Sequence, residues 1–280
     1  MTNISGISYL SDEAECKDTS VVSKYPPSLM TQSGSAIRLQ TIPCSGCRNA
    51  CLSEMAGTYL LVFIGPGAVV VASTLPFASS DEALFFVAAV FACTVGSIIL
   101  AFGRHSGAHV NPAITVAGVA AGAFKRELFL PYVLFQTSGG LLAGLSLFLV
   151  FRTLPSSANL GSTKLAVGIG PLEGFALEVG RTFLLATSAL VASSRLKSPA
   201  SQAALVGTTL FSLIVLIGPL TGASFNPARS LGPSVFSGYS SAQIIYWIGP
   251  LVGAALAGLV FGFVKSHGGK SKEFNLVCLC

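Results

Sequence analysis

Long apolar runs separated by short polar segments occupy most of the chain after residue 50. A helix needs about 20 apolar residues to cross a bilayer. Runs of that length occur near residues 52–74, 83–103, 128–151, 172–193, 202–220 and 242–264. Two shorter apolar stretches, at about 111–120 and 226–236, cannot cross. The pattern predicts an all-α membrane protein with six transmembrane helices and two re-entrant half-helices, which enter the membrane and stop inside it.

The composition agrees with a lipid bilayer as the surrounding medium. Hydrophobic residues make up 52% of the chain and charged residues only 10%, whereas soluble domains average about 25% charged residues. The net charge of +5 comes from basic residues at the ends of apolar runs rather than from one basic patch. We therefore expect no nucleic-acid partner.

The basic residues also predict the orientation. Six spans place both termini on one side, and Lys and Arg concentrate in the cytoplasmic loops of membrane proteins. With both termini inside, 12 of the 16 basic residues are cytoplasmic, and Arg152 and Lys164 lie outside. We expect a polar cytoplasmic tail at residues 1–50, a membrane domain at 51–266 and a cytoplasmic tail at 267–280.

The two halves of the membrane domain repeat each other. The segment 107–113, Gly-Ala-His-Val-Asn-Pro-Ala, recurs as 222–228, Gly-Ala-Ser-Phe-Asn-Pro-Ala, at an offset of 115 residues. The first repeat covers about residues 51–152 and the second about 171–266. Each repeat holds three spans, an odd number, so the copies must have opposite orientations in the membrane.

Two Asn-Pro-Ala motifs are the first candidate site. One copy is a weak signal, since Asn is a preferred helix N-cap and Pro a preferred first helical residue. Two copies, each opening a half-helix of an inverted repeat, favour a channel. Their facing N-termini would repel cations, while the side-chain amides hydrogen-bond water. The residues are Asn111, Pro112, Ala113, Asn226, Pro227 and Ala228.

The non-helical segment before each motif is expected to line the pore with carbonyl groups. Such backbone is tolerated at membrane depth only where it faces protein or water. The residues expected to contribute these carbonyl groups, which accept hydrogen bonds, are Gly107, Ala108, His109, Gly222 and Ser224.

Charged residues at membrane depth need a physical explanation, because a charge there is costly. Arg229 follows the second motif directly and is expected to face the pore; a structural ion pair is the alternative. Glu54 and Glu178 stand at matching places of the two repeats. Their symmetry favours a structural role as buried acids that orient the re-entrant loops, over a proton relay.

These motifs resemble the aquaporin family, also called the major intrinsic proteins. Residues 105–115 and 221–233 carry the resemblance, which covers about residues 50–266. It implies an aquaporin-like channel that passes water and other small neutral solutes, such as hydrogen peroxide, ammonia or small polyols, and excludes protons and ions. It also implies a homotetramer with one pore per subunit. The sequence offers no nucleophile–base set and no metal constellation, so we expect no enzyme activity and no cofactor.

The resemblance further implies an outer selectivity filter of four residues. Spacing from the two motifs places it at Phe91, Ile214, Ala223 and Arg229. Strict water channels of the family usually carry histidine where Ile214 stands, and glycerol facilitators carry glycine there. The Phe-Ile-Ala-Arg set is similar to that of some archaeal and plant intracellular members. A filter of this kind should be wider and less polar than a strict water filter.

Two features depart from the family. Arg181 takes the place that Gly57 has in the first repeat, where the family keeps a small residue. An ion pair with Glu178, three residues earlier, would neutralise Arg181. The alternative is that Arg181 disturbs how Glu178 supports the second loop. Cysteines cluster near both ends, at Cys44, Cys47, Cys51, Cys278 and Cys280. Acylation or prenylation and unmodified thiols both remain open, and the spacing does not favour a metal site.

Another class of function fits part of this pattern. Secondary transporters also use inverted repeats with broken helices. A transporter should hold coupling ions, however, and no pair of acids suited to binding them appears at the expected midplane.

Overall fold

The computed structural model describes residues 44–77, 79–153, 156–238 and 242–267, which are helical apart from turns and short loops. Six of the helices in this described part are long and apolar enough to cross a membrane, which confirms the predicted spans. The long helices are α1 (Cys44–Ala72), α2 (Ser80–Ser106), α4 (Phe129–Phe151), α5 (Pro171–Arg195), α6 (Pro199–Thr221) and α8 (Gln243–His267). Two short 3-10 turns, η2 (Arg126–Leu128) and η3 (Ser156–Gly161), precede and follow α4.

The first helix starts earlier than the predicted end of the N-terminal tail at residue 50. Pro43 directly precedes α1, and proline is favoured at a helix start. Cys47 and Cys51 therefore lie on the first turns of α1. The rest of that tail, and residues 268–280 with Cys278 and Cys280, lie outside the described residues.

The two short apolar stretches form the half-helices α3 (Pro112–Ala120) and α7 (Pro227–Ser237). Asn111 caps α3, its side chain accepting a hydrogen bond from the backbone N–H of Ala113 at 2.8 Å. Asn226 caps α7 in the same way, accepting from Ala228 at 3.0 Å. Each cap is followed by proline, whose fixed φ suits the first helical position.

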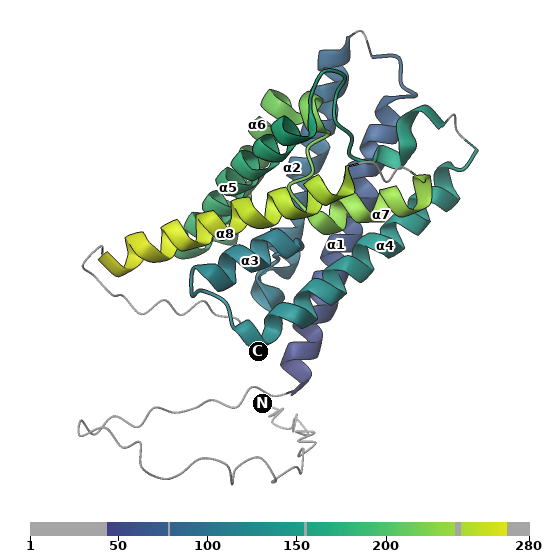
Figure 1. Ribbon diagram of the computed structural model, residues 1–280. Helices are drawn as coiled ribbons and strands as arrows, with labels where there is room; N and C mark the ends of the chain where they lie inside the picture. Colours follow the sequence, from purple (N-terminus) through teal and green to yellow (C-terminus); the bar gives the residue numbers. More distant parts are fainter. Residues whose placement is uncertain (1–43, 78, 154–155, 239–241, 268–280) are drawn as a thin grey trace, which may run out of the picture. The chain divides into compact units, whose positions relative to one another are not determined.

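Each half-helix packs against the last long helix of the opposite repeat: α3 lies along α8, and α7 lies along α4 (Figure 1). Glycines make this approach possible. A Cβ added to Gly144 on α4 would lie 2.1 Å from the carbonyl oxygen of Gly232 on α7. One added to Gly258 on α8 would lie 2.5 Å from the carbonyl oxygen of Ala117 on α3. The two repeats are thus interlocked through their half-helices.

Apolar side chains cover the outside of the long helices. Leu216 is 74% exposed, Phe263 64% and Leu130 60%, whereas small residues such as Ala143 and Ala254 are fully buried between helices. An apolar exterior over a small-residue interior is the arrangement expected of helices packed in lipid.

Candidate pore

The two Asn-Pro-Ala motifs meet inside the helix bundle. The side-chain amide of Asn111 donates to the carbonyl of Phe225 at 2.9 Å, and that of Asn226 donates to the carbonyl of Val110 at 2.9 Å. Each asparagine therefore bonds the residue that directly precedes the other asparagine. Because each also caps its own half-helix, the positive ends of α3 and α7 face a common point.

The loops before the motifs share one unusual backbone pattern. Ala108 (φ 49°) and Val110 (φ 44°) in the first loop correspond to Ala223 (φ 51°) and Phe225 (φ 54°) in the second. L-residues with positive φ are strained, at about 1–3 kcal/mol each, and persist only where surrounding contacts hold them. The same strain at the same places in both repeats marks these loops as a built feature of the site.

Two buried carboxylates hold the strained loops. Glu54 accepts hydrogen bonds from the backbone N–H groups of His109 at 3.0 Å and Val110 at 2.6 Å. Glu178 accepts from those of Ser224 at 3.3 Å and Phe225 at 3.1 Å. Satisfying these N–H groups within the protein leaves the loop carbonyls available to the cavity beside them.

A cavity of about 830 Å³ passes along these loops. Most of the residues singled out from the sequence line it: Phe91, Gly107, Ala108, His109, Asn111, Ile214, Ala223, Ser224, Asn226 and Arg229. The remaining candidates lie off its wall: Glu54, Pro112, Ala113, Glu178, Gly222, Pro227 and Ala228. The off-wall residues include the two carboxylates and the first turns of the half-helices, which shape the wall from behind.

The four predicted filter residues all line the cavity, and they lie near one another in two pairs. The guanidinium carbon of Arg229 lies 5.3 Å from the centroid of the Phe91 ring. A Cβ added to Gly218 would lie 3.4 Å from Ile214 and 3.7 Å from the Cβ of Ala223, so these two line the same stretch of wall. Arg229 is 3% exposed and donates from Nη1 to the carbonyl of Gly161 at 2.9 Å, and within the described residues its Nε has no hydrogen-bond partner.

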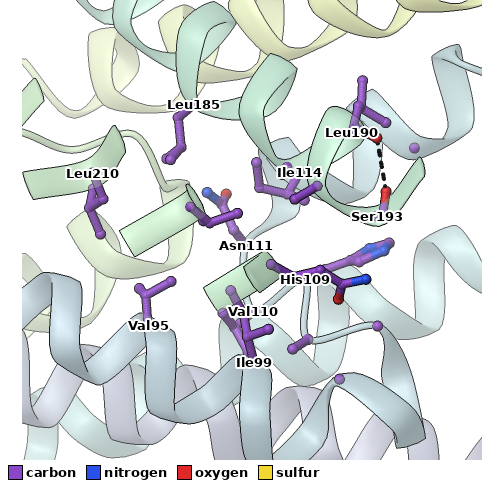
Figure 2. Close-up of a pocket in the computed structure, with 18 of the residues that line it drawn as sticks. Val95, Ile99, His109, Val110, Asn111, Ile114, Leu185, Leu190, Ser193 and Leu210 are labelled. Carbon is purple, nitrogen blue, oxygen red and sulfur yellow. Dashed lines mark hydrogen bonds between the residues drawn. The ribbon is translucent and has the colours of Figure 1, made fainter. Parts of the chain in front are cut away.

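Sequence reasoning missed the apolar residues of the wall that lie outside the predicted filter. Figure 2 shows Val95, Ile99, Leu185 and Leu210 around Asn111. A usable signal was present: Val95 and Ile99 follow Phe91 at successive intervals of four residues, as Leu210 precedes Ile214. Residues spaced by four lie on one face of a helix. The residues at intervals of four from each filter residue can therefore be predicted to line the cavity as well.

Basic residues line the cavity near the ends of α2 and α5. They are Arg104, Arg195 and Lys197. In the predicted orientation these helix ends are cytoplasmic. Among the described residues, no group of three His, Cys, Asp or Glu side chains is placed to hold a metal ion.

The fold and site together define an integral, multi-pass membrane protein with two half-helices meeting at a cavity. Residues 41–261 match the family model described as major intrinsic protein. The chain belongs to the major intrinsic protein family.

Several relatives named as aquaporins resemble most of the chain. Aquaporin TIP4-4 of Zea mays is 35% identical over 80% of this chain and 90% of its own length. Probable aquaporin TIP2-2 of Arabidopsis thaliana is 39% identical, with coverage of 78% and 88%. Probable aquaporin AqpM of Archaeoglobus fulgidus is 34% identical, with coverage of 77% and 96%.

One similar solved structure is the X-ray structure of the aquaglyceroporin from Plasmodium falciparum. It matches with a TM-score of 0.67 at 20% identity, covering 79% of this chain and 96% of that one. This likeness shows a shared fold, in agreement with the six long helices and two half-helices described above.

Proposed function

We propose that this protein is a passive channel for water and other small neutral solutes, and not an enzyme. The observation that carries this proposal is the meeting of Asn111 and Asn226 on the wall of one cavity, where each caps the half-helix of its own repeat and bonds the loop of the other. No conformational cycle is needed to move a solute past two fixed donors.

The two asparagines act as hydrogen-bond donors to the passing solute. Each amide nitrogen carries two hydrogens, of which one bonds the opposite loop, so the second is free for a water molecule. The half-helix termini add roughly half a positive charge each. Cations and protons therefore meet an unfavourable potential at the point where water is bonded best.

Phe91, Ile214, Ala223 and Arg229 form the selectivity filter in this proposal. Arg229 supplies charge and donors, while Phe91, Ile214 and Ala223 supply an apolar wall. A wall with one polar member selects mainly by size. We infer that hydrogen peroxide, ammonia and small polyols pass along with water.

Stopped-flow light scattering of proteoliposomes tests the proposal. Vesicles with the purified protein should shrink in hyperosmotic buffer several-fold faster than protein-free vesicles, and peroxide entry should be faster as well. Asn111→Asp with Asn226→Asp serves as a matched variant, since it removes both amide donors and adds negative charge. A parent rate equal to that of protein-free vesicles would overturn the proposal, and a solute flux that saturates and depends on an ion gradient would favour a secondary transporter.

We further propose a homotetramer with both termini in the cytoplasm. The exposed apolar faces of the long helices leave room for subunit contacts within the membrane. Native mass spectrometry of the detergent-solubilised protein measures the state directly. A mass of one or two chains at low detergent would contradict the tetramer without touching the channel proposal.

A further inference from the structure

Arg181 is a buried arginine close to the cavity that the proposed mechanism does not use. It lies on α5 and is 1% exposed. Its counterpart in the first repeat, Gly57, has no room for a side chain, because a Cβ there would lie 2.5 Å from a methyl carbon of Val110. In the second repeat Phe225 stands in the place of Val110, and the guanidinium carbon of Arg181 lies 5.0 Å from its ring centroid.

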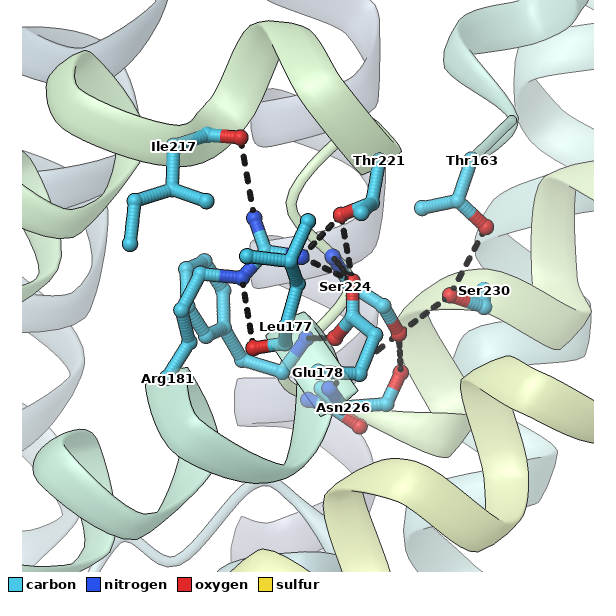
Figure 3. Close-up of polar contacts among 10 residues, drawn as sticks. Thr163, Leu177, Glu178, Arg181, Ile217, Thr221, Ser224, Asn226 and Ser230 are labelled. Carbon is cyan, nitrogen blue, oxygen red and sulfur yellow. Dashed lines mark hydrogen bonds and ion pairs between the residues drawn. The ribbon is translucent and has the colours of Figure 1, made fainter. Parts of the chain in front are cut away.

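All three nitrogens of the guanidinium donate hydrogen bonds, as Figure 3 shows. It forms an ion pair with Glu178 and donates to the hydroxyl of Thr221. It also donates to the carbonyls of Leu177 and Ile217, each at 3.2 Å. Thr221 in turn donates to Glu178 at 2.6 Å. Glu178 still accepts from the loop N–H groups, so pairing with Arg181 leaves its support of the second loop in place.

The two repeats satisfy their buried carboxylates differently. Glu54 receives a third hydrogen bond from the neutral side chain of Gln136 at 2.7 Å, and within the described residues it forms no ion pair with Lys or Arg. The residue matching Gln136 at the offset of 114 is Pro250, which has no donor. Arg181 fills this vacancy in the second repeat, and it does so with a full positive charge.

We propose that Arg181 sets how strongly the pore excludes cations, because it cancels the negative charge of Glu178 and so leaves the positive charge of Arg229 uncompensated. Glu178 bonds Ser224 and Phe225, which both line the cavity. A carboxylate this close to the wall attracts cations, and the attraction is strong where water is scarce. With Arg181 in place, the three buried charged groups of the second repeat, Glu178, Arg181 and Arg229, sum to one positive charge rather than none.

Arg181 also acts as a positioning residue for the filter. Its bonds to Ile217 and Thr221 tie the last turn of α6 to α5, and Ala223 follows two residues after Thr221. Charge and position can be separated by substitution. Lysine keeps the charge with a different shape, whereas methionine keeps much of the length and removes the charge.

The test rests on the proposed channel function and compares water flux with potassium flux in proteoliposomes. Arg181→Met should raise the ratio of potassium to water flux about tenfold, which corresponds to ~1.4 kcal/mol in the barrier. Arg181→Lys should stay near the parent ratio. Glu178→Gln combined with Arg181→Met restores a local charge of plus one and should return the ratio toward that of the parent.

A double variant that leaks as much as Arg181→Met, or a single variant that does not leak, would overturn the role in ion exclusion. If Arg181→Met does not fold, Glu178→Gln alone tests the same charge in the opposite sense, because it adds one positive charge. This variant should raise the ratio of chloride to potassium flux above that of the parent. An unchanged ratio of chloride to potassium flux would overturn the proposal. A parent that passes no water at all would instead refute the proposed function, and this inference with it.

Discussion

Ile214 is the residue on which the proposed solute range depends most. It is 4% exposed within the protein and lines the cavity on the same stretch of wall as Ala223. Its side chain offers no hydrogen bond, so a water molecule passing it must give up bonds that only Arg229 and backbone groups can replace. A less polar solute loses less at such a wall.

Replacing Ile214 by histidine should therefore reverse this preference. The imidazole ring narrows the constriction. Its donor and acceptor also form hydrogen bonds that replace those a water molecule loses on entering. We expect Ile214→His to lower peroxide and small-polyol flux about tenfold, a change of ~1.4 kcal/mol, while water flux falls less than threefold. Parallel stopped-flow assays measure all three solutes. An equal loss for every solute would place the constriction elsewhere.

Arg229 is the charged member of the proposed filter, in contrast to the apolar Ile214. It is held by the carbonyl of Gly161 and by the face of the Phe91 ring. Arg229→Ala removes the charge and opens space beside Phe91, so glycerol and cation fluxes should rise relative to water. The swelling rate in glycerol and a potassium flux assay measure the two effects. A variant with the parent's solute profile and ion exclusion would make Arg229 a structural residue.

Several residues of the candidate site follow from sequence, because the family resemblance implies a filter at set spacings from the two motifs. Phe91 and Ile214 lie at fixed distances from the two motifs, and both are found on the cavity wall. The partners of Arg181 could be predicted only in part. Its pair with Glu178 is local, three residues away on one helix turn, whereas Thr221 and Phe225 reach it through tertiary packing that no local pattern encodes.

At the scale of helices, the half-helices depend on glycines in their neighbours. Gly144 on α4 faces the backbone of Gly232 on α7, and Gly258 on α8 faces that of Ala117 on α3. A half-helix ends inside the membrane, so only one of its ends reaches a membrane surface. The close backbone contact with a long helix holds the other end in position. The approach positions the N-terminus of each half-helix, and with it Asn111 and Asn226.

A single methyl group should disturb this contact. The Cβ of Gly144→Ala would meet a backbone oxygen at 2.1 Å, and overpacking of this kind costs about 1–3 kcal/mol. We expect a lower thermal midpoint in detergent and a reduced water flux. Gly180→Ala is the matched control, because nothing lies within 4 Å of its added Cβ. The same midpoint in both variants would show that α4 and α7 can separate without cost.

The helix pattern was predictable because hydrophobic length is set by the bilayer. All six spans and both half-helices appear where the apolar runs predict them. The start of α1 at Cys44 was not predictable from hydropathy, because residues 44–50 are too polar to extend an apolar run. The sequence signal for that boundary is instead the preceding proline, Pro43.

At the scale of the whole molecule, the inverted repeat makes the two ends of the cavity alike in backbone, and side chains distinguish them. Arg229 lies with Phe91 toward one end, while Arg104, Arg195 and Lys197 belong to helix ends at the other. The positive-inside rule assigns that second end to the cytoplasm. On this assignment we expect both termini to lie in the cytoplasm.

Two exposed residues at opposite ends of α5 allow the orientation to be measured. Val167 precedes α5 and Ser198 follows it, and both are exposed. All seven native cysteines are first replaced by serine. In this background, Val167 and Ser198 are then replaced by cysteine, one in each variant. Because α5 crosses the membrane once, the two thiols must face opposite sides. A membrane-impermeant maleimide added to sealed, right-side-out vesicles should label Val167→Cys and leave Ser198→Cys unlabelled, and permeabilisation should expose both. Labelling of Ser198→Cys alone would invert the topology, and labelling of both in intact vesicles would mean that α5 does not span.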